Sequence, residues 1–240
     1  MKHQAATFKW MASEWYVGFD CATKTFGFCI LKFALAYYRE HRDRLWATLR
    51  RAQAGRATRA EIRALDRETR GLIRFADGDV TDLFPGRADA DIHTVERVRA
   101  LIRHVNARVV PSIGRLTAGH EKKDVNVPIE FQMGPNAPAR VISDALITLF
   151  HEYNVFLVGP ALKNKVWCTE AGRHCYFVEK FARVYDANKA HTAFNFEFLE
   201  TTFGTEIPPT KPKKKRGHIA DSAMQVFGYV LHGDKSKEQF

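Results

Sequence analysis

Two short apolar runs near the start of the chain are rich in aromatic and β-branched residues. They cover residues 15–20 and 25–31, with a four-residue turn between them, and this pattern predicts a β-hairpin. Beyond residue 71, strand-like runs alternate with segments of helical periodicity. Such alternation is typical of an α/β protein in which helices cover a sheet. We therefore expect an α/β fold.

Periodicity and turn residues predict the later elements. We expect strands at 72–84, 125–131 and 155–158, helices at 92–109, 139–153, 187–203 and 219–231, and a basic loop at 208–215. The chain has 240 residues, of which 45% are hydrophobic and 27% charged, so disordered and disulfide-scaffold classes are excluded. One domain over residues 1–240 is expected.

The sequence shows no pattern of a membrane span, a signal peptide or a disulfide framework. No run approaches the roughly 18 apolar residues of a membrane span, and residues 1–14 have no apolar signal core. We therefore expect an intracellular protein that has no membrane partner. The four cysteines (Cys21, Cys29, Cys168 and Cys175) contain no CxxC pair, so reduced thiols are favoured over a metal held by Cys168, His174 and Cys175.

Much of the formal net charge of +10 lies in one helical segment, residues 33–70. Residues 39–74 contain eleven arginines and five acidic residues. Gly55 breaks the segment, and Thr58 with Glu61 forms a capping-box pattern that begins a second helix. Two interpretations stay open: a solvated face with pairs such as Glu40 and Arg44, or an arm that contacts phosphates.

Three carboxylates fall at predicted buried elements rather than on polar faces. Asp20 closes the first strand, Glu130 lies near the end of a later strand, and Asp221 lies in the last helix. Taken singly, they suit a turn residue, a partner of Arg140 and a helix-dipole charge. Together they favour a magnesium site, because Mg²⁺ prefers oxygen ligands from separate elements. His218, one helical turn before Asp221, is a fourth ligand or a group that positions water.

These residues carry a resemblance to a known family. The motifs are Val17-Gly18-Phe19-Asp20 with Thr25-Phe26-Gly27-Phe28, then Ile129-Glu130-Phe131-Gln132, then His218-Ile219-Ala220-Asp221-Ser222-Ala223. In this order they resemble the RuvC-type Holliday junction resolvases of the RNase H-like superfamily. Within that group, Gly217 to Met224 after the lysine-rich loop is most similar to the resolvases of poxviruses and related large DNA viruses. The likeness covers residues 15–31 and roughly 74–231.

The resemblance implies a fold, a cofactor and a reaction. It implies an RNase H-like mixed five-stranded sheet flanked by helices, a homodimer, and paired nicking of four-way DNA junctions with two Mg²⁺ ions, or Mn²⁺ as a substitute. By the resemblance, Asp20, Glu130 and Asp221 are metal ligands, and His218 stands where members carry Asp or His. The matches to its DNA-contacting lysines are Lys163, Lys165 and Lys189.

Three further segments extend this comparison. The run at 211–216 contains Lys213, Lys214 and Lys215, and we interpret it as a phosphate contact beside the last helix rather than as a nuclear-import patch or a solvated loop. The helix at 139–153 matches the family's dimer helix, with packing on the sheet as the alternative. Residues 33–70 depart from the family core and form a basic helical insertion.

The sequence therefore predicts an enzyme, a metal-dependent endodeoxyribonuclease that resolves Holliday junctions. Its place of action is then wherever DNA is replicated, which for a viral protein is a virus factory in the host cytoplasm or the nucleus. The alternatives are another RNase H-like nuclease that acts on RNA:DNA hybrids, and a catalytically inert nucleic-acid-binding module. An actin-like ATPase is disfavoured, because that fold needs two such domains.

Overall fold

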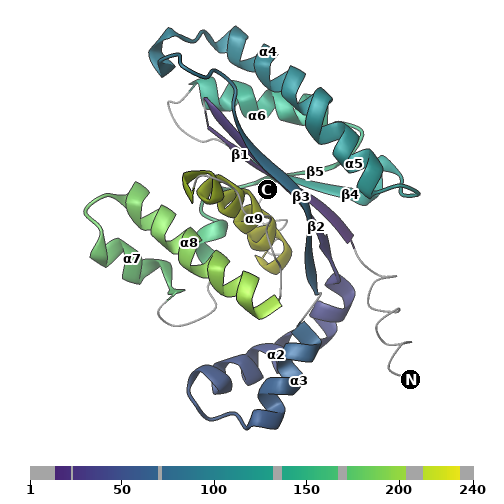
Figure 1. Cartoon of the computed structure of the whole chain (residues 1–240), viewed down its shortest axis with the longest axis vertical. Helices are drawn as coiled ribbons and strands as arrows, with labels where there is room; N and C mark the ends of the chain where they lie inside the picture. Colours follow the sequence, from purple (N-terminus) through teal and green to yellow (C-terminus); the bar gives the residue numbers. More distant parts are fainter. Residues whose placement is uncertain are drawn as a thin grey trace.

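The computed structural model describes residues 14–22, 24–69, 72–131, 137–166, 172–203 and 213–232. Within these residues, five strands form one mixed sheet in the order β3-β2-β1-β4-β5 (Figure 1). The strands are β1 (Glu14–Cys21), β2 (Thr25–Phe33), β3 (Ile73–Asp82), β4 (Val125–Glu130) and β5 (Asn154–Val158). The expected hairpin is confirmed, because β1 and β2 pair antiparallel. The α/β class and the flanked, mixed five-stranded sheet are confirmed as well.

The sheet changes direction at its centre. β3, β2 and β1 form an antiparallel meander, whereas β4 pairs parallel to β1 and β5 parallel to β4. The parallel connections require crossovers, and helices supply them. The helices on this part of the chain are α4 (Thr94–His104), α5 (Val110–Leu116) and α6 (Ala137–Leu149).

Hydrophobic cores lie on both faces of the sheet, because successive strand residues point to opposite sides. Val17 and Phe19 of β1 join the core under α4, α5 and α6, together with Ile142 and Leu146 of α6. Tyr16 joins the second core, under α8 (Val184–Phe203) and α9 (Lys213–His232). Asp20 lies four residues after Tyr16 on the same strand, so its side chain points to the same face of the sheet, toward α9.

Two glycines bring α9 close to the sheet. A Cβ built on Gly18 of β1 would overlap the carbonyl oxygen of Ser222, and one on Gly27 of β2 would lie 3.1 Å from the Cβ of His218. Because neither glycine carries a side chain, α9 lies directly on β1 and β2. This close contact sets His218 and Asp221 against the end of β1.

The arginine-rich segment forms two helices between β2 and β3, α2 (Leu35–Gln53) and α3 (Arg59–Thr69), which Figure 1 shows at one end of the molecule. The predicted capping box is present, since Glu61 accepts from the Thr58 amide and hydroxyl while Thr58 Oγ1 accepts from the Glu61 amide. Ion pairs join the two helices, Arg44 with Glu68 and Arg51 with Glu61.

Other elements differ from the expectation. The helix predicted at 92–109 continues to Leu116 through a π-helical stretch, Val105–Val109. This wider turn ends two residues before Pro111, which lacks the N–H that a regular α-turn needs. Helix α9 begins at Lys213, so the loop predicted over 208–215 is wrong for its last three residues, and 204–212 lie outside the described part. Helix α7 (His174–Lys180) and the short turn η4 (Lys163–Lys165) were missed.

The described residues include no helix with the length and apolarity required to span a membrane. Three of the four cysteines are described, and Cys21, Cys29 and Cys175 form no disulfide among the described residues. Cys168 lies outside the described residues, and with it the alternative metal site that would include it.

Candidate active site

Three carboxylates from separate elements meet at one edge of the sheet. Asp20 is the penultimate residue of β1 and Glu130 the last residue of β4. The two strands are parallel and pair Trp15 with Val125. Continued along the strands, this register sets Asp20 beside Glu130. Asp221 comes from α9, which packs on the face of β1 and also contacts β4.

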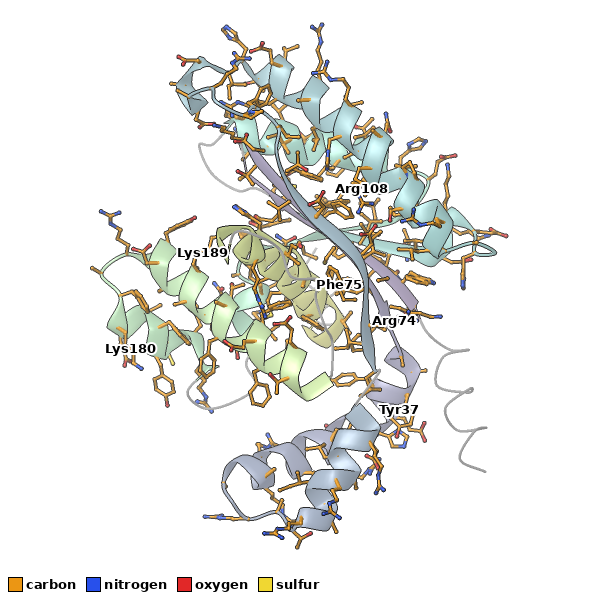
Figure 2. The ribbon with its side chains drawn as sticks, viewed as in Figure 1. Tyr37, Arg74, Phe75, Arg108, Lys180 and Lys189 are labelled. Carbon is orange, nitrogen blue, oxygen red and sulfur yellow. The ribbon has the colours of Figure 1, made fainter. Side chains whose placement is uncertain are left out.

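Two lysines balance the negative charge of these carboxylates. The Nζ atom of Lys163 lies 3.6 Å from Glu130 Oε2 and 3.4 Å from Asp221 Oδ1. Lys189 of α8 donates to the other oxygen of Asp221. Only 2% of the Asp221 side chain is exposed, and a carboxylate so deeply buried is costly without a cation. Figure 2 labels Lys189 in the first half of α8.

Both lysines stay charged in this environment. Burial alone would lower the pKa of Lys163, but the negative charges of Asp221, Glu130 and Asp20 outweigh it and raise the pKa above its ordinary value. Burial also acts against Lys189, and again Asp221 and Asp20 raise the pKa. All three carboxylates are therefore close enough to act on the Lys163 ammonium group, and Asp221 and Asp20 also act on that of Lys189.

His218 is held by the first carboxylate. Its Nδ1 lies 2.6 Å from Asp20 Oδ2. An ionised carboxylate only accepts hydrogen bonds, so Nδ1 carries the proton that is donated. In a neutral ring the other nitrogen, Nε2, then keeps a lone pair. The predicted face shared by His218 and Asp221 on one helix is confirmed, because both lie against the sheet edge.

One residue at the site was missed by the sequence analysis. Gln225 lies one helical turn after Asp221, and its Nε2 donates to Glu130 Oε2. Its four-residue spacing from Asp221 is the signal that would have found it. Cys21, which follows Asp20, takes no ionised role: burial, Asp20 and Glu130 raise the pKa of its thiol well above the ordinary value.

The side chains at this site are of the kind that bind a metal ion, but they are not arranged to hold one in this structure. Carboxylate oxygens from three elements are the ligands that a hard divalent cation prefers, and this position already accommodates positive charge. Among the described residues, however, no three His, Cys, Asp or Glu side chains are grouped so that they could hold one ion. The lysine ammonium groups lie against the carboxylate oxygens instead. The donors fit Mg²⁺ in kind, and binding requires these lysines to move.

Within the described ranges, the structure gives no contact between the remaining predicted site residues and this cluster. Lys165 is exposed on the same short turn as Lys163. The backbone of Lys213, Lys214 and Lys215 forms the start of α9, and their side chains lie outside the described part.

The apolar side of the helix predicted at 139–153, the expected dimer helix, packs mostly inside the fold. Ile142, Leu146 and Phe150 lie in the core, while Val141 is 40% exposed. The packing alternative therefore accounts for these three side chains. The homodimer stays a prediction that this apolar side does not support.

Comparisons of the chain with protein-family models, with curated proteins and with solved structures found no match. Its likeness to the resolvases therefore rests on the three sequence motifs and on the cluster that their residues form.

Proposed function

We propose that this chain is a metal-dependent endonuclease of the RNase H-like type that resolves four-way DNA junctions. The observation that carries the proposal is the meeting of Asp20, Glu130 and Asp221 around shared lysine ammonium groups. A cluster of carboxylates that is balanced by lysine ammonium groups could exchange these groups for a divalent metal, which prefers the same oxygen atoms. The mixed five-stranded sheet agrees with the fold that the resemblance implies.

The proposed cofactor is Mg²⁺, with Mn²⁺ as a substitute, and two ions in each site. Asp20, Glu130 and Asp221 would hold them, with His218 as a further candidate ligand. When bound, such ions supply an activated water and stabilise charge on the leaving oxygen of a phosphodiester.

The chain's own residues have separate tasks in this proposal. Asp20 fixes the ring of His218 through the Nδ1 hydrogen bond, which leaves Nε2 to accept a proton from the attacking water. Lys163 and Lys189, released from the carboxylates, would pair with phosphate oxygens of the DNA. Gln225 holds Glu130 from the helix side. The basic charge of the chain favours a polyanionic substrate.

Resolution of a junction by two symmetric nicks needs two sites, so a homodimer belongs to the proposal. The place of action belongs to it too: the site of DNA replication, which for a viral enzyme is a virus factory in the cytoplasm or the nucleus.

Cleavage of three labelled substrates tests the function. A four-way junction, a linear duplex and an RNA:DNA hybrid are incubated with wild type and Asp20→Asn in Mg²⁺. We expect paired nicks near the crossover of the junction with wild type and none with Asp20→Asn, because the variant loses a ligand charge while keeping its shape. Cutting of the hybrid alone would indicate an RNase H activity, and junction binding without cutting would indicate an inert binding module.

Two substitutions at His218 separate its candidate roles in the same assay. We expect His218→Asn and His218→Asp both to lower cleavage by about 10²–10⁴-fold, the usual contribution of a general base, with junction binding retained. Retained activity of His218→Asp in Mg²⁺ would instead identify His218 as a ligand that a carboxylate replaces.

A further inference from the structure

A patch of apolar side chains is exposed where α7 turns into α8. In the part of the chain that the structure describes, eleven large hydrophobic side chains are exposed, and five of these lie between residues 176 and 185. We call these five the α7–α8 patch: Tyr176, Val178, Phe181, Val184 and Tyr185. Tyr185 is 68% exposed and Val184 63%. Grouped apolar exposure of this kind marks a surface that binds a partner.

The patch is not the packing face of α7. Phe177 makes that contact, since its ring centroid lies 5.6 Å from the ring of His191 and 5.8 Å from that of Phe194, both on α8. The residues of the patch therefore remain on the outside after the two helices have packed together. In Figure 1 the turn between α7 and α8 stands at the edge of the molecule, away from the sheet.

One residue connects the patch to the candidate active site. Lys189 follows Tyr185 by one helical turn, and its Nζ lies 5.7 Å from the centroid of the Tyr185 ring. The same ammonium group donates to Asp221. A molecule stacked on Tyr185 would thus lie one lysine side chain away from the carboxylate cluster.

The charges around the patch select the kind of partner. Lys180 and Arg183 are exposed beside it together with the acids Glu179 and Asp186, and at its borders lie the half-exposed Arg173 and Lys189, of which Lys189 is paired with Asp221. Figure 2 labels Lys180 on α7 and Lys189 on α8, one on each side of the turn. The partner should therefore combine negative charge with flat apolar faces. Unpaired nucleotides have both properties, because their bases stack on aromatic rings while lysine and arginine pair with the phosphates.

We propose that the α7–α8 patch binds unpaired bases of a DNA substrate, with Tyr185 as the stacking platform and Phe181 beside it. This inference rests on the proposed function, since it assigns to that site a preference for DNA whose strands separate next to the scissile phosphate. A continuous duplex keeps its bases stacked on each other and offers nothing for Tyr185 to stack on.

The test measures binding without cleavage. Fluorescence anisotropy in EDTA compares three probes: a duplex with a central single-stranded gap of thymines, a four-way junction, and an unbroken duplex of the same length. The proteins are wild type, Tyr185→Ala, Tyr185→Trp and the control Val95→Ala, which removes an exposed side chain from α4. Tyr185 is 68% exposed, so its truncation leaves the core intact.

We expect Tyr185→Ala to weaken binding to the gapped probe by at least about fivefold, the lower end of what one stacked base contributes. Binding to the unbroken duplex should change by less than about twofold. Tyr185→Trp should restore affinity, and Val95→Ala should match wild type. The combined variant Phe181→Ala/Tyr185→Ala should lose more of the preference for gapped DNA.

Equal loss of affinity on the gapped and unbroken probes would overturn the inference. Unchanged binding of Tyr185→Ala to both probes would overturn it too. So would a wild type that self-associates or binds vesicles, if Tyr185→Ala abolished that property while DNA binding persisted. The result of this binding test can be distinguished from the result of the cleavage test of the proposed nuclease. A wild type that prefers gapped DNA through Tyr185 but never cuts would reject the proposed function alone, whereas a resolvase with unaltered Tyr185→Ala binding would reject the patch alone.

Discussion

Two lysine ammonium groups from different elements balance the charge on Asp221. Lys163 comes from η4 and Lys189 from α8, and both contact the carboxylate. A divalent cation that bound the same oxygens would also balance the charge. If the proposed metal binds here, lysine and metal compete for the carboxylates, and removal of one lysine should change how strongly metal stabilises the fold.

Lys163→Met removes one competitor while it keeps the apolar part of the side chain. In EDTA we expect the free energy of unfolding to fall by about 3–5 kcal/mol, because Glu130 and Asp221 lose a buried counter-charge. On addition of Mg²⁺ or Mn²⁺ we expect a larger rise in Tm for the variant than for wild type, because no ammonium group at this position has to be displaced. Differential scanning fluorimetry with and without metal measures both effects.

Lys165→Met serves as the matched control, since Lys165 is exposed on the same turn. Its Tm should equal that of wild type in both buffers. A metal-dependent rise in Lys163→Met that is no larger than that of wild type would show that lysine and metal do not share the carboxylates.

The sequence predicted the three acidic residues of the site but only some of the residues that contact them. Asp20, Glu130 and Asp221 stood out because a carboxylate in an apolar element needs compensation. Gln225 carries no charge and gave no such signal. Lys163 was selected through the resemblance alone, because a lysine in an irregular segment has no periodicity that would place it in space.

At the scale of elements, the site depends on how closely α9 packs on β1. Gly18→Ala tests this, because a Cβ there would overlap the carbonyl oxygen of Ser222, a backbone atom that cannot rotate away. We expect a loss of about 1–3 kcal/mol or more in the free energy of unfolding, as overpacked cores show. Urea denaturation followed by circular dichroism measures it.

Gly114→Ala is the control for that substitution. Gly114 lies in α5, and a Cβ there meets nothing within 4 Å, so the change should stabilise the chain by up to about 1 kcal/mol through helix propensity. If Gly18→Ala were as stable as wild type, the close packing of α9 on β1 would not be required.

The hairpin of α2 and α3 offers a second prediction at this scale. Arg59 and Arg63 are exposed and one turn apart on α3. If the hairpin contacts DNA, Arg59→Gln/Arg63→Gln should weaken junction binding and reduce the slope of log K against log salt by about 0.9 for each phosphate that the variant no longer neutralises. Titrations at several salt concentrations measure the slope.

The matched control is Arg99→Gln/Arg103→Gln, which removes the same charge at the same spacing from α4, on the other face of the sheet. It should leave the slope unchanged. Equal effects of the two pairs would indicate a general charge effect, and no effect of the α3 pair would leave the hairpin as a solvated face.

The elements themselves were predictable where hydrophobic periodicity was strong. The hairpin, α4 and α6 follow directly from it. The continuation through Pro111 was missed because a proline ordinarily ends a helix. Here Pro111 follows a π-helical stretch and lies in the first turn of α5, where proline is tolerated. The early start of α9 was missed because lysines and a nearby proline are typical of a loop.

At the scale of the whole molecule, two cores hold helices on opposite faces of one sheet, and the candidate site lies where the second set meets the sheet edge. The fold class was predictable because strand alternation and helical periodicity are local properties. The meeting of η4, α8 and α9 was not, because it depends on contacts between segments far apart in the sequence. Helix α8 is central to it, since it carries Lys189 toward the site and packs against α7 through His191.

Stability of the whole chain should depend on pH through His191, which is 0% exposed. Burial, and then the charge of His174, lower its pKa from 6.5 to about 4. In the unfolded chain it binds a proton near pH 6.5, and in the folded chain only near pH 4, so acid favours the unfolded state. Between these values His191 should reduce the free energy of unfolding by up to about 1.4 kcal/mol per pH unit.

Urea denaturation at pH values from 7.5 to 4 tests this with His191→Leu, whose profile should be flatter than that of wild type over this range. The slope is the quantity compared, so a constant packing loss from the substitution does not affect the result. His120→Gln, at an exposed histidine, is the control and should keep the wild-type slope. Parallel profiles for wild type and His191→Leu would mean that His191 can be protonated without unfolding. The packing of α7 on α8 would then have to open at mild acidity while the sheet and both cores stayed folded.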